Sequence, residues 1–153
     1  MNVNFYKLRA VVLLWLVRFL AKILFVEFPP ILSVAGLVEK KGKLLFIDLP
    51  YMNGLGLPGG IVGKGETLEE SLRREILEET GLKVESSKYL WSTAGFFKVP
   101  SISVVFGVRV SGNLKESPEG KPIWIGAEEA VGRMGYKNAE LDLKKYLETN
   151  PSF

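Results

Sequence analysis

The chain of 153 residues contains no histidine and no cysteine. Without cysteine it cannot form a disulfide framework or a zinc finger, and it has no thiol nucleophile. Without histidine it has no Ser-His-Asp triad, no imidazole base and no imidazole ligand for a metal. Any catalysis must therefore use carboxylates, lysine, tyrosine or a metal ion held by oxygen atoms.

An excess of positive charge is also missing from most of the chain. The formal net charge is +3, and residues 1–28 account for all of it. They contain four basic residues, Lys7, Arg9, Arg18 and Lys22, and one acidic residue, Glu27. The other 125 residues carry 16 basic and 16 acidic side chains. A neutral domain without a basic cluster is poorly suited to binding a nucleic-acid backbone, so we expect no nucleic-acid partner.

Residues 1–28 are predicted to form a hydrophobic, amphipathic helix. The run AVVLLWLVRFLAKILFVEF, residues 10–28, is long enough to span a bilayer, but Arg18 and Lys22 interrupt it. Three interpretations remain open: a helix in or across a membrane, a helix buried against its own domain or a second subunit, and a cleaved signal peptide. The nearest small-residue cleavage site, 33–35, lies in a predicted strand, which disfavours the signal peptide. We favour attachment to the inner face of the membrane, with the domain in the cytoplasm.

Residues 29–153 are predicted to form one α+β domain with a mixed sheet. Pro29 and Pro30 end the N-terminal helix. Runs 31–39 and 43–49 predict a hairpin, and residues 50–65, with six glycines and two prolines, predict a loop without regular elements. The remaining pattern predicts helices at 67–81, 127–134 and 138–147, and strands near 89–94, 102–110 and 122–125.

The helix that begins at Thr67 has an unusual acidic face. Thr67 and Glu70 form a capping-box pattern, and Gly81 marks the end of the helix. Glu75, Glu78 and Glu79 stand at i, i+3 and i+4, so their carboxylates share one face. Such repulsion costs only tenths of a kcal/mol per pair on a solvated surface, so these three residues alone do not predict a site.

The residues around this acidic face complete a longer pattern. It reads Gly60, five residues, Glu66, seven residues, Arg74-Glu75-Ile76, one residue, Glu78-Glu79, one residue, Gly81-Leu82. A glycine loop folded against three carboxylates makes an all-oxygen site that suits Mg²⁺ or Mn²⁺. At every specified position the pattern resembles the signature of the Nudix hydrolases.

The resemblance implies an α/β/α sandwich and a reaction. Members of the family usually hydrolyse a nucleoside diphosphate linked to another group, by attack of water on phosphorus, with Mg²⁺ or Mn²⁺. Carried over by position, Arg74 would orient the carboxylates, while Gly59, Glu66 and Gly81 would shape the motif. The implied metal ligands are the Gly60 carbonyl, Glu75, Glu78 and Glu79.

The general base stays open, because the family takes it either from the helix, here Glu75, or from a later loop. Residues 115–120 resemble that loop, in which Glu119 is the preferred carboxylate and Glu116 the second choice; an ordinary solvated loop is the alternative. The family's markers for ADP-ribose and dinucleoside polyphosphate substrates are absent from residues 96–99.

Two further residues are candidates for binding the substrate. Phe96 is expected to stack on a base or to belong to the core. Asn138 resembles a position at which triphosphate pyrophosphohydrolases of the family read the base, but an ordinary N-cap is the interpretation we favour. The expected function is a Mg²⁺-dependent pyrophosphohydrolase of a nucleoside triphosphate or nucleotide sugar. The alternatives are a non-catalytic nucleotide sensor and a hydrolase of a lipid-linked diphosphate.

Overall fold

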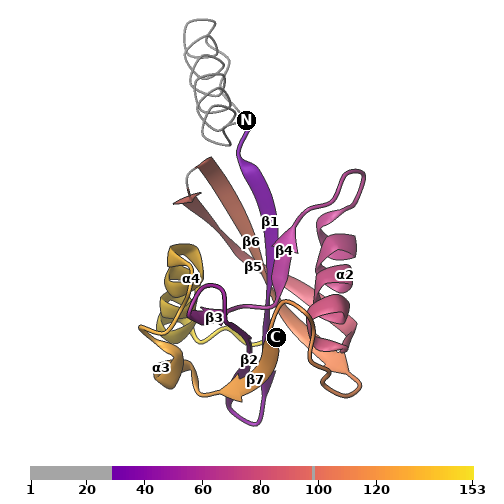
Figure 1. Cartoon of the computed structure of the whole chain (residues 1–153), viewed down its shortest axis with the longest axis vertical. Coiled ribbons are helices and arrows are strands. Elements are labelled where there is room, and N and C mark those ends of the chain that lie inside the picture. Colours follow the sequence, from indigo (N-terminus) through magenta and orange to yellow (C-terminus); the bar gives the residue numbers. More distant parts are fainter. Residues whose placement is uncertain (1–28, 98) are drawn as a thin grey trace, which may run out of the picture.

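The computed structural model describes residues 29–97 and 99–153 as a seven-stranded mixed sheet between two layers of helices. Helix α2 covers one face of the sheet, and helices α3 and α4 cover the other (Figure 1). The predicted α+β sandwich is therefore confirmed. The strands are β1 (Ile31–Lys40), β2 (Lys43–Leu49), β3 (Gly54–Gly56), β4 (Gly59–Ile61), β5 (Lys83–Phe97), β6 (Val99–Ser111) and β7 (Lys121–Ile125), and the helices are α2 (Leu68–Thr80), α3 (Ala127–Ala130) and α4 (Lys137–Thr149).

Strand β1 connects the two halves of the sheet. Along most of its length it pairs in parallel with β6, from Ile31 opposite Ser101 to Val38 opposite Val108. On its other side it pairs first with β4 and later with β2, both antiparallel. Because β4 pairs with the first half of β1, the glycine segment that precedes α2 is fixed in the middle of the molecule (Figure 1).

Alternating side chains of the sheet form two cores. Val34 and Val104 pack with Leu72 and Ile76 of α2. Neighbouring positions on the same strands point the other way, and among them Leu37 and Val105 pack with α4. This is the period of two that a strand buried on both faces requires. The two sets of side chains pack helices against both sides of the central strand.

Helix α2 begins and ends where the sequence predicts. The Thr67 hydroxyl accepts from the Glu70 backbone N–H, while a Glu70 carboxylate oxygen accepts from the Thr67 backbone N–H at 2.8 Å. At the other end, Gly81 has φ 73°, and its N–H donates to the Leu77 carbonyl at 2.9 Å. These two caps fix the length of the helix and the face that its acidic residues occupy.

The prediction that residues 50–65 lack regular elements is wrong, because β3 and β4 lie within this segment. Both strands pair through backbone groups alone, which glycine provides as well as any residue. A Cβ atom on Gly59 would lie 2.1 Å from the Val34 carbonyl oxygen, so this close pairing of β4 with β1 requires glycine. Strands β5 and β6 are longer than predicted, and α3 is shorter.

The predicted N-terminal helix, residues 1–28, lies outside the described residues, so the boundary at residue 29 remains a prediction. Among the residues that the structure describes, no helix combines the length and the hydropathy needed to cross a bilayer.

Candidate active site

Glu79 is the most deeply buried carboxylate of the acidic face. Glu79 is only 5% exposed, and the Gly59 N–H donates to its Oε2 at 2.7 Å. Burial raises the pKa of Glu79 to about 8, the Gly59 hydrogen bond opposes this rise, and the charges of Glu119, Glu75 and Glu78 add to it. Negative charge at Glu79 is therefore poorly compensated by the protein itself.

Gly60 and Glu75 lie in direct contact. A Cβ atom on Gly60 would stand 2.5 Å from the Glu75 carboxylate, so only glycine leaves room for this side chain. Arg74 donates to Glu75 Oε1 from one guanidinium nitrogen at 2.7 Å, and the same nitrogen reaches Glu78 Oε2 at 3.3 Å. The Glu75 side chain is 12% exposed and that of Glu78 is 59% exposed. The structure therefore brings the predicted glycine loop and acidic residues together.

Glu66 connects the loop to the helix. Two nitrogens of Arg74 donate to its two carboxylate oxygens, at 2.7 and 2.9 Å, and the Gly63 N–H donates to it at 3.0 Å. Ser71, a buried residue that sequence reasoning missed, donates its hydroxyl proton to Glu66 at 2.5 Å. Arg74, and then Ser71, hold the pKa of Glu66 at about 2. Arg74 thus forms its bidentate pair with Glu66 and contacts Glu75 and Glu78 with one nitrogen.

The loop between β6 and β7, which contains residues 115–120, returns to the end of α2. Its Lys115 N–H donates to the Thr80 carbonyl at the end of α2, at 2.9 Å. Glu119, near the tip, lies close enough for its charge to raise the pKa of Glu79. Glu116 instead forms an ion pair with Lys121, at 3.1 Å. Of the two predicted carboxylates, Glu119 is the one whose charge acts on Glu79.

The donor set has the chemistry that a hard divalent cation requires. All of the side-chain ligands it offers are carboxylate oxygens, and a cation would stabilise the ionised form of Glu79, which burial and neighbouring carboxylates disfavour. Among residues 29–97 and 99–153, no three acidic side chains are already arranged around one ion position. Arg74 currently pairs with Glu75 and Glu78, so an ion would have to replace the guanidinium group as their partner.

A cavity of about 340 Å³ adjoins the glycine loop. Gly59 and Gly60 line one part of it, and the beginning of α4, with Tyr136 and Asn138, lines another. Tyr136 also shares a hydroxyl contact of 3.3 Å with Tyr51, a pair that sequence reasoning missed. The cavity therefore offers space between the beginning of α4 and the Gly59-Gly60 segment, whose Gly59 N–H donates to Glu79.

Asn138 does not cap the helix, so the prediction of an ordinary N-cap at this residue is wrong. The N-cap is Tyr136, and the Asn138 side chain lines the cavity instead, where its Nδ2 donates to Ser101 Oγ at 3.4 Å. The physical reason is that the N-cap lies two residues before Asn138, which frees the carboxamide from capping. The Phe96 side chain lies outside the described part of the chain, so its role remains a prediction.

Asp142 is a buried acidic residue that sequence reasoning missed. It is 1% exposed and lines the cavity. Burial raises the pKa of its carboxyl, while hydrogen bonds from Thr93 and Trp91 and the charge of Lys145 lower it. Its position four residues after Asn138, among the buried apolar positions of α4, is the signal that could have identified it.

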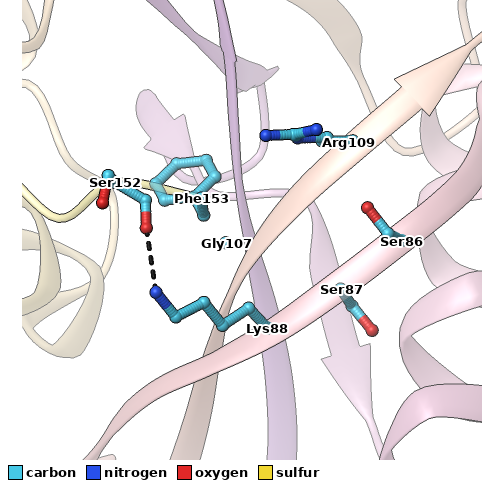
Figure 2. Close-up of a pocket in the computed structure, with 7 residues that line it drawn as sticks. All are labelled: Ser86, Ser87, Lys88, Gly107, Arg109, Ser152 and Phe153. Atoms are coloured by element: carbon cyan, nitrogen blue, oxygen red, sulfur yellow. Dashed lines mark hydrogen bonds between the residues drawn. The ribbon is translucent and has the colours of Figure 1, made fainter.

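A second, more open cavity of about 430 Å³ lies beside the C-terminal segment (Figure 2). Its described lining residues include Lys88 and Arg109 but no acidic residue. The Lys88 amine donates to the Ser152 carbonyl at 3.1 Å, and the Phe153 ring occupies the space above Gly107 (Figure 2). Among the described lining residues the two cavities share none, and only the first is lined by Gly59 and Gly60.

Comparisons with known proteins agree with this geometry. A family model described as the NUDIX domain matches residues 28–148. An ADP-ribose pyrophosphatase of Methanocaldococcus jannaschii is 41% identical over 101 residues, which are 60% of this chain and 59% of that protein. A MutT-like protein of Streptomyces ambofaciens is 34% identical over 115 residues, 69% of this chain and 71% of that protein.

Solved structures share the fold. A MutT protein from Methanosarcina mazei superposes with a TM-score of 0.71 at 25% identity, covering 82% of this chain and 99% of that one. The ORF135 protein of Escherichia coli gives a TM-score of 0.70 at 23% identity, covering 80% and 92%. Because the family model covers most of the chain, including the whole glycine loop and acidic helix, the chain belongs to the Nudix hydrolase family.

Proposed function

We propose that the chain is a divalent-metal-dependent pyrophosphohydrolase that cleaves a nucleoside diphosphate linked to another group, with water attacking phosphorus. The observation that carries this proposal is the buried Glu79, which accepts a hydrogen bond from Gly59, a residue that lines the neighbouring cavity. The name of one relative, ADP-ribose pyrophosphatase, supports the same class of reaction.

Each residue of the motif has a proposed part in binding or positioning. Glu75, Glu78, Glu79 and the Gly60 carbonyl would hold Mg²⁺ or Mn²⁺, which would neutralise charge on the diphosphate and acidify a water molecule. Arg74 positions the carboxylates, and Glu66 keeps Arg74 in place through its bidentate pair. Glu119 accepts the proton of the attacking water, with Glu75 as the other candidate for this role.

Glu79→Gln tests the proposal directly. The variant keeps the shape of the side chain but removes the charge, so we expect kcat to fall by about 10²- to 10³-fold or more. Purified protein with Mg²⁺ would be given nucleoside triphosphates, ADP-ribose, NADH, dinucleoside polyphosphates and prenyl diphosphates, and released phosphate and pyrophosphate would be measured. Glu69→Gln, an exposed position on the same helix, is the control and should keep normal turnover.

The panel also separates the alternatives. Turnover restricted to prenyl diphosphates would favour the lipid-linked substrate that the apolar run at residues 10–28 suggests. Tight nucleotide binding with no turnover of any compound would contradict the hydrolase proposal and favour the nucleotide sensor.

A further inference from the structure

The cavity beside the C-terminal segment is lined by two cationic side chains, Lys88 and Arg109 (Figure 2). The other described lining residues are Gly107, Phe153 and three serines, none of which is acidic. A Cβ atom on Gly107 would overlap the Phe153 ring, so glycine lets the C-terminal segment rest on the sheet and form one wall. The volume of about 430 Å³ lies in the range of small-molecule sites.

The pairing of β5 with β6 places the two cations on one face of the sheet. Lys88 pairs with Gly107, and Ser86 pairs with Arg109. Lys88 and Arg109 are therefore diagonal neighbours, and residues at such positions lie about 7–8 Å apart. Like charges at this separation repel each other, and an anion bound between them would offset the repulsion.

Both cations keep hydrogen-bond donors for a ligand. The Lys88 amine gives one N–H to the Ser152 carbonyl at 3.1 Å, which fixes the ammonium group and leaves two donors. Within residues 29–97 and 99–153, the Arg109 guanidinium has no hydrogen-bond or ion-pair partner. Its planar set of N–H groups suits two oxygens of a phosphate group, and the nearby ammonium suits a third.

Two glutamates on the neighbouring strands flank the part of β6 that carries Arg109, and both carboxylates have other partners. Glu39 of β1 accepts a hydrogen bond from the Tyr146 hydroxyl at 3.1 Å. Glu85 of β5 accepts one from the Ser111 hydroxyl. Neither glutamate forms an ion pair with the cations of the cavity. The positive charge of the lining is therefore not neutralised by direct pairing.

We propose that this cavity is a second ligand site, separate from the acidic face, and that it binds a phosphate-type dianion between Lys88 and Arg109. Inorganic phosphate and the phosphate group of a monoester share this chemistry. The protein itself supplies the positive charge, so binding here requires no divalent cation, in contrast to the acidic face. The inference therefore stands or falls independently of the proposed hydrolysis.

Inorganic phosphate titrated into the full chain tests the site, with EDTA present so that no metal draws phosphate to the acidic face. Backbone amide shifts in NMR spectra would report where the anion binds. We expect saturable shifts at residues 86–88 and 107–109, with a millimolar or lower dissociation constant, and none at Gly59 and Gly60. Sodium chloride at equal ionic strength controls for screening. Acetate, a monoanion, should bind at least about tenfold more weakly. AMP should compete with phosphate for the same residues if a monoester enters the site.

Three variants separate a specific site from general attraction of anions. Arg109→Gln should weaken phosphate binding by about tenfold or more. Arg133→Gln is the matched control, because it removes the same charge from a guanidinium that pairs with Glu129 outside this cavity, and it should bind as the wild type does. Glu85→Gln removes a nearby negative charge and should tighten binding about two- to threefold.

The wild type alone can overturn the proposal, so the test does not depend on a variant folding. Shifts that phosphate and sodium chloride produce equally, equal affinities for phosphate and acetate, or saturable shifts confined to the glycine loop would each contradict it. Unchanged phosphate affinity in a folded Arg109→Gln would do the same.

Discussion

Two glutamates of the same motif have opposite electrostatic environments. Glu66 accepts hydrogen bonds from Arg74, Ser71 and the Gly63 N–H, and its pKa is held at about 2. Glu79 is buried with one backbone donor among other carboxylates, and its pKa is raised to about 8. Glu66 therefore remains ionised and holds the loop, whereas Glu79 is the carboxylate that would gain most from a bound cation.

Glu119→Gln tests the assignment of the proton acceptor. Glu119 is exposed, and its charge acts on Glu79. If it accepts the proton of the attacking water, the variant should lower kcat by about 10²-fold or more while the affinity for Mg²⁺ changes by less than about threefold. Steady-state kinetics at several Mg²⁺ concentrations would measure both quantities. Glu116→Gln, whose carboxylate pairs with Lys121, is the matched control. A near-normal kcat in Glu119→Gln would remove Glu119 from the mechanism and leave Glu75.

At the scale of elements, the site depends on the close approach of β4 to β1 and to α2. The Gly59 N–H reaches Glu79 on α2, while the same residue pairs with Ala35 on β1. Gly60 then contacts Glu75, one turn earlier on the helix. Helix α2 is itself capped at both ends, so its carboxylates are presented to β4 in a fixed register.

Gly60→Ala tests this approach. The new methyl group would displace the Glu75 carboxylate, which lies 2.5 Å from its expected position, so we expect kcat to fall by about tenfold or more. The thermal midpoint should change by only a few degrees, since the new methyl group meets the end of the Glu75 side chain and not the backbone. Gly126→Ala is the control, because its methyl group would meet nothing within 4 Å. Wild-type activity in Gly60→Ala would show that the position of Glu75 is not important for turnover.

For the whole molecule, the raised pKa of Glu79 links stability to pH. Its ordinary value is 4.5 and its folded value about 8, so in this range the folded protein binds more protons than the unfolded chain. The contribution of Glu79 to the free energy of unfolding therefore falls as pH rises from 4.5 to about 8, with a slope of at most about 1.4 kcal/mol per pH unit. Glu66 acts oppositely at lower pH, because stability is lost as pH falls from 4.5 towards 2.

Thermal unfolding in the presence of a chelator, measured at pH 4.5 and at about pH 8, would test the effect of Glu79 on stability. The thermal midpoint of the wild type should fall between pH 4.5 and about 8 more steeply than that of Glu79→Gln. Added Mg²⁺ should raise the midpoint most near pH 8, where binding keeps Glu79 ionised, and should have little effect on the variant. Parallel pH curves for the two proteins would contradict the assignment.

Much of the fold and of the motif could be predicted from the sequence. Helix α2, with Thr67 and Gly81 at its ends, depends on local hydrogen bonds that the residue types already specify. Strands β3 and β4 could not be predicted, because glycine-rich strands carry no side-chain period and are defined by pairing with distant strands. Asn138 was misassigned for a related reason: its partner, Ser101, lies 37 residues earlier in the sequence.

The sequence by itself determined which side-chain types are available to a site in this protein. With no histidine or cysteine, and with Glu75, Glu78 and Glu79 on one helical face behind a glycine segment, only an oxygen-ligand site was available. The tertiary structure decided which of these carboxylates is buried, how Arg74 is shared among them, and where the loop with Glu119 returns. It also brought Asp142 of α4 to Trp91 and Thr93 of β5. The cavity likewise depends on the tertiary structure, because it forms only where separate strands and a helix leave the space between them unfilled.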